Sequence, residues 1–478
     1  MRRNTYSIVF LFLLVLPVFS FSIQPEKNNG YKIEVNLEDI QNSDLYLGFH
    51  YGNKQFIKDT ARLDENGHGV FTGDEPLQQG IYLIITPAKK YFEILLGEDQ
   101  HFSFTANASD FIHSIEFKGS EINEAFNEYQ KFMIKQNQRS QTLRKRLNAN
   151  KGNPDSTEII NKKLSEMDKN VKNKWKSIAS EYPNTILSTI IQAMQTPETP
   201  DFEIPESASN PDSIRWQKRY QYFKNHYFDN IDLSDERLVR TPILHNKIKN
   251  YFENVLIQEP DSIIPQVDKV INQTSGSEEA FQYVTRYLIN HYQKSNIMGM
   301  DKVFVHIAEN YYLTGEADWM DEESLDKLRE RVSKIKPNII GNKAPVLKLP
   351  TISNEFASLH DIDSKYTILY FWEPNCGHCK TVTPKIWDIY QDYSRDQLEV
   401  FAVYTQVDQE EWLEYINDKG FDWINVWDPQ HTSNFRNKYD IYSTPTIYLI
   451  NENKEIEAKR IDHESLKKML EQKLGKIE

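Results

Sequence analysis

The stretch that decides the fold runs from residue 366 to residue 380 and reads Tyr366-Thr-Ile-Leu-Tyr-Phe-Trp-Glu-Pro-Asn-Cys-Gly-His-Cys-Lys380. Its first half is a continuous, mostly apolar run, which is typical of a strand that is buried on both faces of a sheet. A Cys-x-x-Cys pair follows at once, and the pattern from Lys380 onward is helical. The sequence therefore predicts a strand-to-helix turn with two cysteines at the start of the helix.

These two cysteines, Cys376 and Cys379, are the only ones in the 478 residues, so no disulfide can join separate domains. Unpaired backbone N–H groups and the helix dipole favour a thiolate at the first cysteine, whereas the second lies one turn inside the helix and should have the higher pKa. We expect a redox-active disulfide in which Cys376 is the attacking sulfur and Cys379 the resolving one. Gly377 and His378, between them, would tune the thiolate.

Two other interpretations of the pair have less support. A structural disulfide that closes a loop of two residues would constrain little of the unfolded chain. A zinc site would need two further ligands with their own local spacing, and the sequence offers no second cysteine pair and no nearby histidine pair. We therefore expect neither a metal nor a cofactor.

The residues that follow alternate between strand and helix patterns, which predicts a parallel or mixed sheet with helices on both faces. The expected strands are residues 398–404, 423–427, 446–450 and 456–460, the last two as a hairpin, and the expected helices are residues 409–419 and 464–474. This α/β domain is predicted to span residues 337–478.

The preceding residues separate into a β-patterned and a helical part. Between residues 31 and 119 short runs of period two are punctuated by turn residues, and Asn66-Gly67 is a hairpin signal, so we expect a small all-β, sandwich-like domain over residues 23–119. Residues 120–336 are expected to form an all-α domain, with long helices over 121–148 and 155–182. Its predicted core includes a stripe of aromatic side chains at helical spacing (Trp216, Tyr220, Phe223, Tyr227) and Tyr251 and Phe252 beyond it.

Residues 1–22 have a basic start, an apolar run interrupted at Pro17, and small residues before a break, which predicts a cleaved signal peptide. A retained membrane anchor is the alternative, although the run is short for a span of about 20 residues. No later stretch is long and apolar enough to span a bilayer. The net charge of −14 opposes binding to nucleic acid.

Three segments carry a resemblance to the exported TlpA/ResA branch of the thioredoxin superfamily: residues 370–380, Gly341-Asn-Lys-Ala-Pro345 and Tyr442-Ser-Thr-Pro-Thr446. The resemblance covers residues 337–478. It implies that the Thr444-Pro445 bond is cis and that this loop faces the dithiol and binds an extended substrate. The order of signal peptide, β domain, helical domain and thioredoxin-like domain also resembles a group of exported proteins of Gram-negative bacteria, whose first two domains have no assigned function.

Two positions depart from the family pattern. Tyr370 stands where thioredoxins have a buried aspartate, and Val382 stands where TlpA/ResA proteins often have a glutamate. The carboxylate that assists proton transfer to the resolving thiol is therefore missing. Glu373 and Lys380 are the candidates for a proton relay in its place, and the alternative for Glu373 is an exposed loop carboxylate.

The sequence thus predicts an exported thiol-disulfide oxidoreductase, located in the periplasm or cell envelope, that acts on protein thiols and disulfides together with a redox partner. The direction stays open: His378 favours an oxidant or isomerase, whereas most TlpA/ResA proteins are reductants. One alternative is an envelope-binding or adaptor protein in which the dithiol is secondary. The other is a thiol peroxidase, but Glu373 occupies the position where a peroxidatic site of the peroxiredoxin type has threonine.

Overall fold

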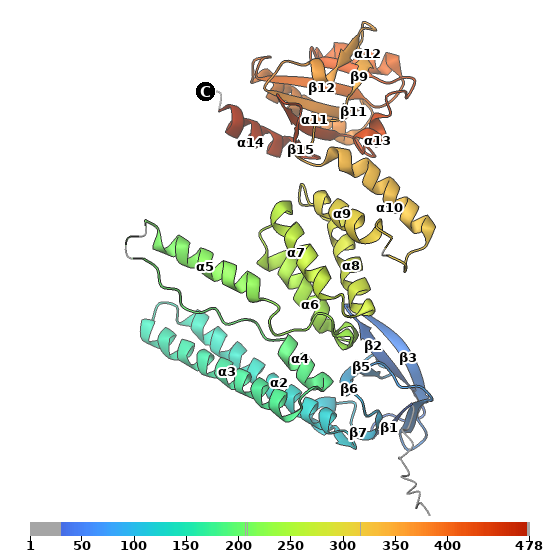
Figure 1. Cartoon of the computed structure of the whole chain (residues 1–478), viewed down its shortest axis with the longest axis vertical. Helices are drawn as coiled ribbons and strands as arrows, with labels where there is room; N and C mark the ends of the chain where they lie inside the picture. Colours follow the sequence, from blue (N-terminus) through green and yellow to red (C-terminus); the bar gives the residue numbers. More distant parts are fainter. Residues whose placement is uncertain (1–29, 206, 208, 316, 476–478) are drawn as a thin grey trace, which may run out of the picture. The chain divides into compact units, whose positions relative to one another are not determined.

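The computed structural model describes residues 30–205, 207, 209–315 and 317–475, and the expected signal peptide lies outside these residues. The chain divides into two compact units. One holds the described residues up to 48 together with residues 57–141, and the other holds residues 49–56 and the described residues from 142 onward. Figure 1 labels the helices and strands in the order of the sequence. Within the described residues, none of the helices combines the length and hydropathy that a membrane span requires.

The N-terminal part is rich in strands, as the sequence predicts. It contains two four-stranded sheets, with the strand orders β4-β1-β7-β8 and β3-β2-β5-β6. Strand β1 alternates between buried and more exposed side chains, so its apolar residues share one face of the sheet. The edge strands β3 and β8 complete the sheets. The bounds are β1 (Tyr31–Leu37), β2 (Asp44–Tyr51), β3 (Lys54–Arg62), β4 (His68–Gly73), β5 (Gly80–Ile85), β6 (Tyr91–Leu96), β7 (His101–Ala106), α1 (Phe111–Ser114) and β8 (Glu116–Lys118).

The middle of the chain is helical, which confirms the expected class. Leu143, near the end of the long helix α2, packs against Ile160 and Met167 of α3. A larger core lies among the later helices and includes Tyr251, Val284 and Phe304. The helices are α2 (Glu121–Ala149), α3 (Pro154–Glu181), α4 (Ile186–Ala193), α5 (Pro211–His226), α6 (Pro242–Asn250), α7 (Pro260–Gln273), α8 (Glu278–Gln293), α9 (Asp301–Ile307) and α10 (Glu322–Ile335), with shorter turns such as η3 (Ala308–Tyr312).

The aromatic stripe of residues 216–227 is only partly a core feature, which corrects the prediction from its spacing. Tyr227 is buried, as are Tyr251 and Phe252. Trp216, however, is 62% exposed and stacks on Tyr220 along the surface of α5, a helix without buried side chains. The spacing places the rings on one face of a helix but does not ensure that another element covers that face.

The C-terminal part is a mixed five-stranded sheet with the order β13-β12-β11-β14-β15. Strands β12 and β13 continue parallel from the central β11, whereas β14 is antiparallel to β11. The bounds are β9 (Lys348–Pro350), β10 (Phe356–Ser358), β11 (Tyr366–Trp372), α11 (Gly377–Gln391), β12 (Leu398–Tyr404), α12 (Gln409–Lys419), β13 (Ile424–Trp427), α13 (Phe435–Lys438), β14 (Thr446–Asn451), β15 (Ile456–Lys459) and α14 (His463–Leu474).

Both faces of this sheet are covered, which explains the continuous apolar run in β11. Tyr370 and Trp372 pack into one cluster with side chains from α11, α12 and α14, whereas Phe371 packs into a second cluster with Phe435 of α13. Because successive side chains of a strand point to opposite faces, a strand between two apolar layers does not alternate between apolar and polar side chains. The dithiol follows at the carboxyl end of β11.

Candidate active site

The side chain of Cys376 caps the N-terminus of α11. Its backbone is extended, with φ −75° and ψ 124°, and its Sγ accepts a hydrogen bond from the N–H of Cys379 at 3.4 Å. Both cysteines are free thiols. Cys376 is partly exposed, whereas Cys379 is 1% exposed because the first turn of α11 directs it toward the apolar layer below the helix.

This geometry separates the pKa values of the two thiols. Burial is the largest influence on the pKa of Cys376 and raises it, but hydrogen bonds from Cys379 and the N–H of His378 outweigh burial, so the net shift is downward. At Cys379 burial again comes first and raises the pKa to about 12. A thiolate therefore forms more readily at Cys376, in the order that the sequence predicts.

The loop before β14 lies against the first cysteine. The Thr444-Pro445 peptide bond is cis, and the thiol of Cys376 donates a hydrogen bond to the backbone oxygen of Thr444 at 3.3 Å. Segments 68 residues apart thus meet at one sulfur. Pro445 has no N–H group, so at that position the loop cannot donate a competing hydrogen bond to the sulfur.

Glu373 differs from the exposed loop carboxylate considered above. It is half-buried, and both of its carboxylate oxygens accept hydrogen bonds, one from Thr444 Oγ1 at 2.7 Å and the other from Gln406 Nε2. A second link joins the same loop to α12, where Asn375 donates to the carboxylate of Glu411. No motif marks Gln406 or Glu411 in the sequence, so sequence reasoning misses both residues.

The other predicted residues lie on the exposed side of α11. An added Cβ at Gly377 would meet open space, and His378 is exposed beside it. Lys380 is also exposed, and among the described residues no side-chain hydrogen bond or ion pair connects it to either cysteine. The structure therefore brings Glu373 into the site by its contacts but does not do the same for Lys380.

Tyr370 occupies the position of the family's buried aspartate without replacing its charge. Its hydroxyl lies 2.8 Å from the hydroxyl of Thr383, and both residues are 0% exposed. Burial raises the pKa of Tyr370 well above its ordinary value, so the phenol stays neutral. No charge therefore replaces the family's carboxylate at this position.

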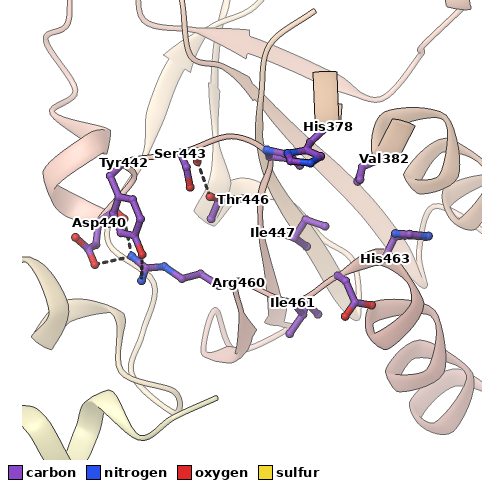
Figure 2. Close-up of a pocket in the computed structure, with 12 residues that line it drawn as sticks. His378, Val382, Asp440, Tyr442, Ser443, Thr446, Ile447, Arg460, Ile461 and His463 are labelled. Carbon is purple, nitrogen blue, oxygen red and sulfur yellow. Dashed lines mark hydrogen bonds and ion pairs between the residues drawn. The ribbon is translucent and has the colours of Figure 1, made fainter. Parts of the chain in front are cut away.

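A pocket of about 380 Å³ opens beside the cis-proline loop (Figure 2). Val382, Ile447 and Ile461 form apolar parts of its lining, and His378 and His463 contribute imidazoles. The remaining side chains come mainly from the cis-proline loop and the β15–α14 turn, and are Asp440, Tyr442, Ser443, Pro445, Thr446, Arg460 and Asp462.

One side chain at the pocket edge is held in place although it is largely exposed. Tyr442 is 70% exposed, and the guanidinium of Arg460 lies 4.6 Å from the centre of its ring. Arg460 also donates to the Tyr442 hydroxyl at 2.9 Å and forms an ion pair with the buried Asp440 (Figure 2). An aromatic surface is thus fixed next to the redox site.

Comparisons with known proteins find similarities to three parts of the chain. Residues 363–456 match a family described as thioredoxin-like. The thiol-disulfide oxidoreductase ResA of Oceanobacillus iheyensis is 31% identical over 125 residues, which are 25% of this chain and 62% of ResA. The C-terminal domain is thus thioredoxin-like and resembles the TlpA/ResA branch of the thioredoxin superfamily. The two preceding parts, residues 31–126 and 157–338, match domains of unknown function, DUF4369 and DUF5106.

Solved structures of other proteins are also similar to parts of this chain. A thioredoxin-like protein from Bacteroides caccae is 21% identical, with 58% of this chain and 99% of that chain covered and a TM-score of 0.43. A domain of a possible thiol-disulfide isomerase from Cytophaga hutchinsonii is 39% identical, with 28% of this chain and 93% of that chain covered and a TM-score of 0.27.

Proposed function

We propose that this protein is an exported thiol-disulfide oxidoreductase that acts on protein substrates through Cys376 and Cys379. The observation that carries the proposal is the pair of thiols at the start of α11. One is partly exposed, has a lowered pKa and touches the cis-proline loop, and the other is buried with a pKa of about 12. A dithiol needs this asymmetry, because one sulfur must attack while the other waits.

In the reducing direction the Cys376 thiolate attacks one sulfur of a substrate disulfide. A mixed disulfide forms, and the displaced substrate sulfur leaves as a thiolate that takes a proton. Cys379 then loses its proton and attacks the sulfur of Cys376, which releases the second substrate thiolate and leaves the Cys376–Cys379 disulfide. Two electrons pass to the substrate, and a redox partner must return them. In the oxidising direction each step is reversed.

We assign Glu373 to positioning rather than to proton relay. Both of its oxygens are occupied by side chains of the surrounding loops, and through Thr444 it holds the carbonyl that contacts Cys376. In Glu373→Gln the side-chain oxygen can still accept the hydrogen bond from Thr444. The new amide NH₂ group can donate to the side-chain oxygen of Gln406, once the Gln406 amide has rotated. Glu373→Ala removes both contacts.

The pH–rate profile of insulin reduction distinguishes these roles. Positioning predicts that Glu373→Gln keeps the wild-type profile, and that Glu373→Ala raises KM by about 10-fold or more, the usual scale of a lost charge-assisted hydrogen bond. A Glu373→Gln enzyme that loses the acidic or basic limb of the profile would establish a proton relay instead.

Trapping of mixed disulfides tests the proposed function itself. Cys379→Ala should accumulate covalent complexes with substrate proteins that dithiothreitol releases, and Cys376→Ala, the matched control, should accumulate none. Equal complexes with both variants would exclude the assigned roles. A redox titration of the Cys376–Cys379 couple gives the direction of electron transfer. A potential near that of thioredoxin, about −270 mV, would exclude a role as an oxidant of substrate thiols.

Export to the periplasm or cell envelope is part of the proposal and rests on the sequence of residues 1–22. Fusion of these residues to alkaline phosphatase, which is active only outside the cytoplasm, tests it. An inactive fusion, with an active one from a known signal peptide as control, would exclude export.

A further inference from the structure

A groove of about 370 Å³ lies in the helical domain, within the residues that match DUF5106. Helix α8 contributes Arg286, Ile289, Asn290 and Gln293, and α10 contributes Ser324, Lys327, Leu328 and Arg331. On both helices the spacing is three, one and three residues, so each presents one face to the groove. The volume is at the lower end of the roughly 300–1,000 Å³ typical of small-molecule sites.

The charged residues that line this groove are all basic. Three of its lining residues, Arg286, Lys327 and Arg331, are basic and none is acidic, although acidic residues outnumber basic ones by 70 to 56 in the whole chain. A site of this composition attracts an anion.

The three cations differ in how far they are already neutralised. Among the described residues Arg286 has no ion pair. Lys327 pairs with Glu323, but both side chains are more than 70% exposed, so this pair holds the ammonium weakly. Arg331 uses one nitrogen on Asp440 and keeps its other donors. The groove therefore retains donors for an anionic group.

The floor of the groove is apolar. Ile289 and Phe304 are buried, and Leu328 is half-buried. Tyr312 also lines the groove, is 3% exposed, and has a hydroxyl without a hydrogen-bond partner among the described residues. A buried hydroxyl without a partner is unfavourable, and a bound ligand or its ordered water would relieve that cost.

We propose that this groove binds a small amphipathic anion, with its apolar body on the floor and a carboxylate or phosphate group at Arg286 and Lys327. The basic rim selects the sign of the head group, and the apolar floor selects against a simple inorganic anion. The site is separate from the dithiol and gives the helical domain a binding function of its own.

Isothermal titration of the purified protein with four probes of equal chain length tests the ligand class. Each probe is used below its critical micelle concentration. Decanoate or decyl phosphate should bind saturably at one site, and the tighter of the two identifies the head group. Decanol should bind at least about 10-fold more weakly, and decyltrimethylammonium should not bind. Equal binding of all four probes, or binding of none, would overturn the proposal.

Variants then locate the site. Arg286→Gln should weaken binding of the tighter probe by about 10-fold, because it removes a charge-assisted contact. Arg219→Gln, which changes an exposed arginine on α5 in the same way, is the matched control and should bind like the wild type. Tyr312→Phe should weaken binding of the same probe, because it removes the buried hydroxyl but keeps the apolar floor of the groove. Equal affinities for the two arginine variants would overturn the assignment, and insulin reduction should be unchanged in both.

Discussion

At pH 8 the alkylation rates of the two thiols of the reduced protein should differ by about three orders of magnitude. Cys379 has a pKa of about 12, so roughly one molecule in 10⁴ carries its thiolate at that pH. The pKa of Cys376 lies below the ordinary value of 9.0, so at least about one molecule in ten carries that thiolate. The thiolate is the reactive species, and the low exposure of Cys379 increases the difference further.

Short pulses of iodoacetamide between pH 6 and pH 10 measure this difference. Both cysteines lie on the tryptic peptide of residues 366–380, so fragmentation of this one peptide in a mass spectrometer locates the label. The labelling rate of Cys376 should rise with pH to a midpoint below 9. In Cys376→Ala the remaining Cys379 should stay nearly unlabelled, because burial is the main cause of its raised pKa. Comparable rates for the two sulfurs, or faster labelling of Cys379, would refute the assignment of roles.

Three further predictions concern the stability of the fold. Tyr370→Phe leaves the buried hydroxyl of Thr383 without its partner and should lower the free energy of unfolding by about 1–3 kcal/mol in urea; an unchanged value would contradict the contact. Burial lowers the pKa of Lys247 to about 8. Between pH 8 and 10 the unfolded chain therefore binds more protons than the folded chain, and stability rises with pH. The melting temperature should increase over this range in wild type but not in Lys247→Met. Gly52→Ala would place a Cβ 1.7 Å from the Tyr283 hydroxyl at a φ of +56° and should lower the free energy of unfolding by about 1–3 kcal/mol; wild-type stability would show that the loop adapts.

The sequence identifies the part of the site that depends on chain order. The apolar run of β11 is continuous because both faces of the sheet are covered, and the first cysteine follows it by only a few residues, so strand, turn and helix N-terminus are fixed locally. The family resemblance predicts the cis bond before Pro445, and its position opposite Cys376 follows from the antiparallel pairing of β14 with β11.

Contacts between side chains of distant segments are not visible in the sequence. Glu373 meets Gln406 and Thr444 only because the ends of β11 and β12 and the start of β14 converge at one edge of the sheet. The exposure of Trp216 is a similar case, since helical spacing defines a face but not its neighbour. A composition of mixed charge likewise does not reveal a groove whose charged lining residues are all basic, because Arg286 and Arg331 come together through the packing of α8 and α10.

The site lacks the family's carboxylates at residues 370 and 382, so Cys379 must lose its proton in another way. The interaction between the two thiols provides one. Besides burial, the hydrogen bond to Cys376 and the charge of its thiolate raise the pKa of Cys379. Both influences end when Cys376 becomes part of a mixed disulfide, because that sulfur then carries no charge. The N–H of Glu373, which lowers the pKa of Cys379, stays in place. The pKa of the resolving thiol therefore falls at the step at which it must attack, so the neutral side chain of Tyr370 is compatible with turnover.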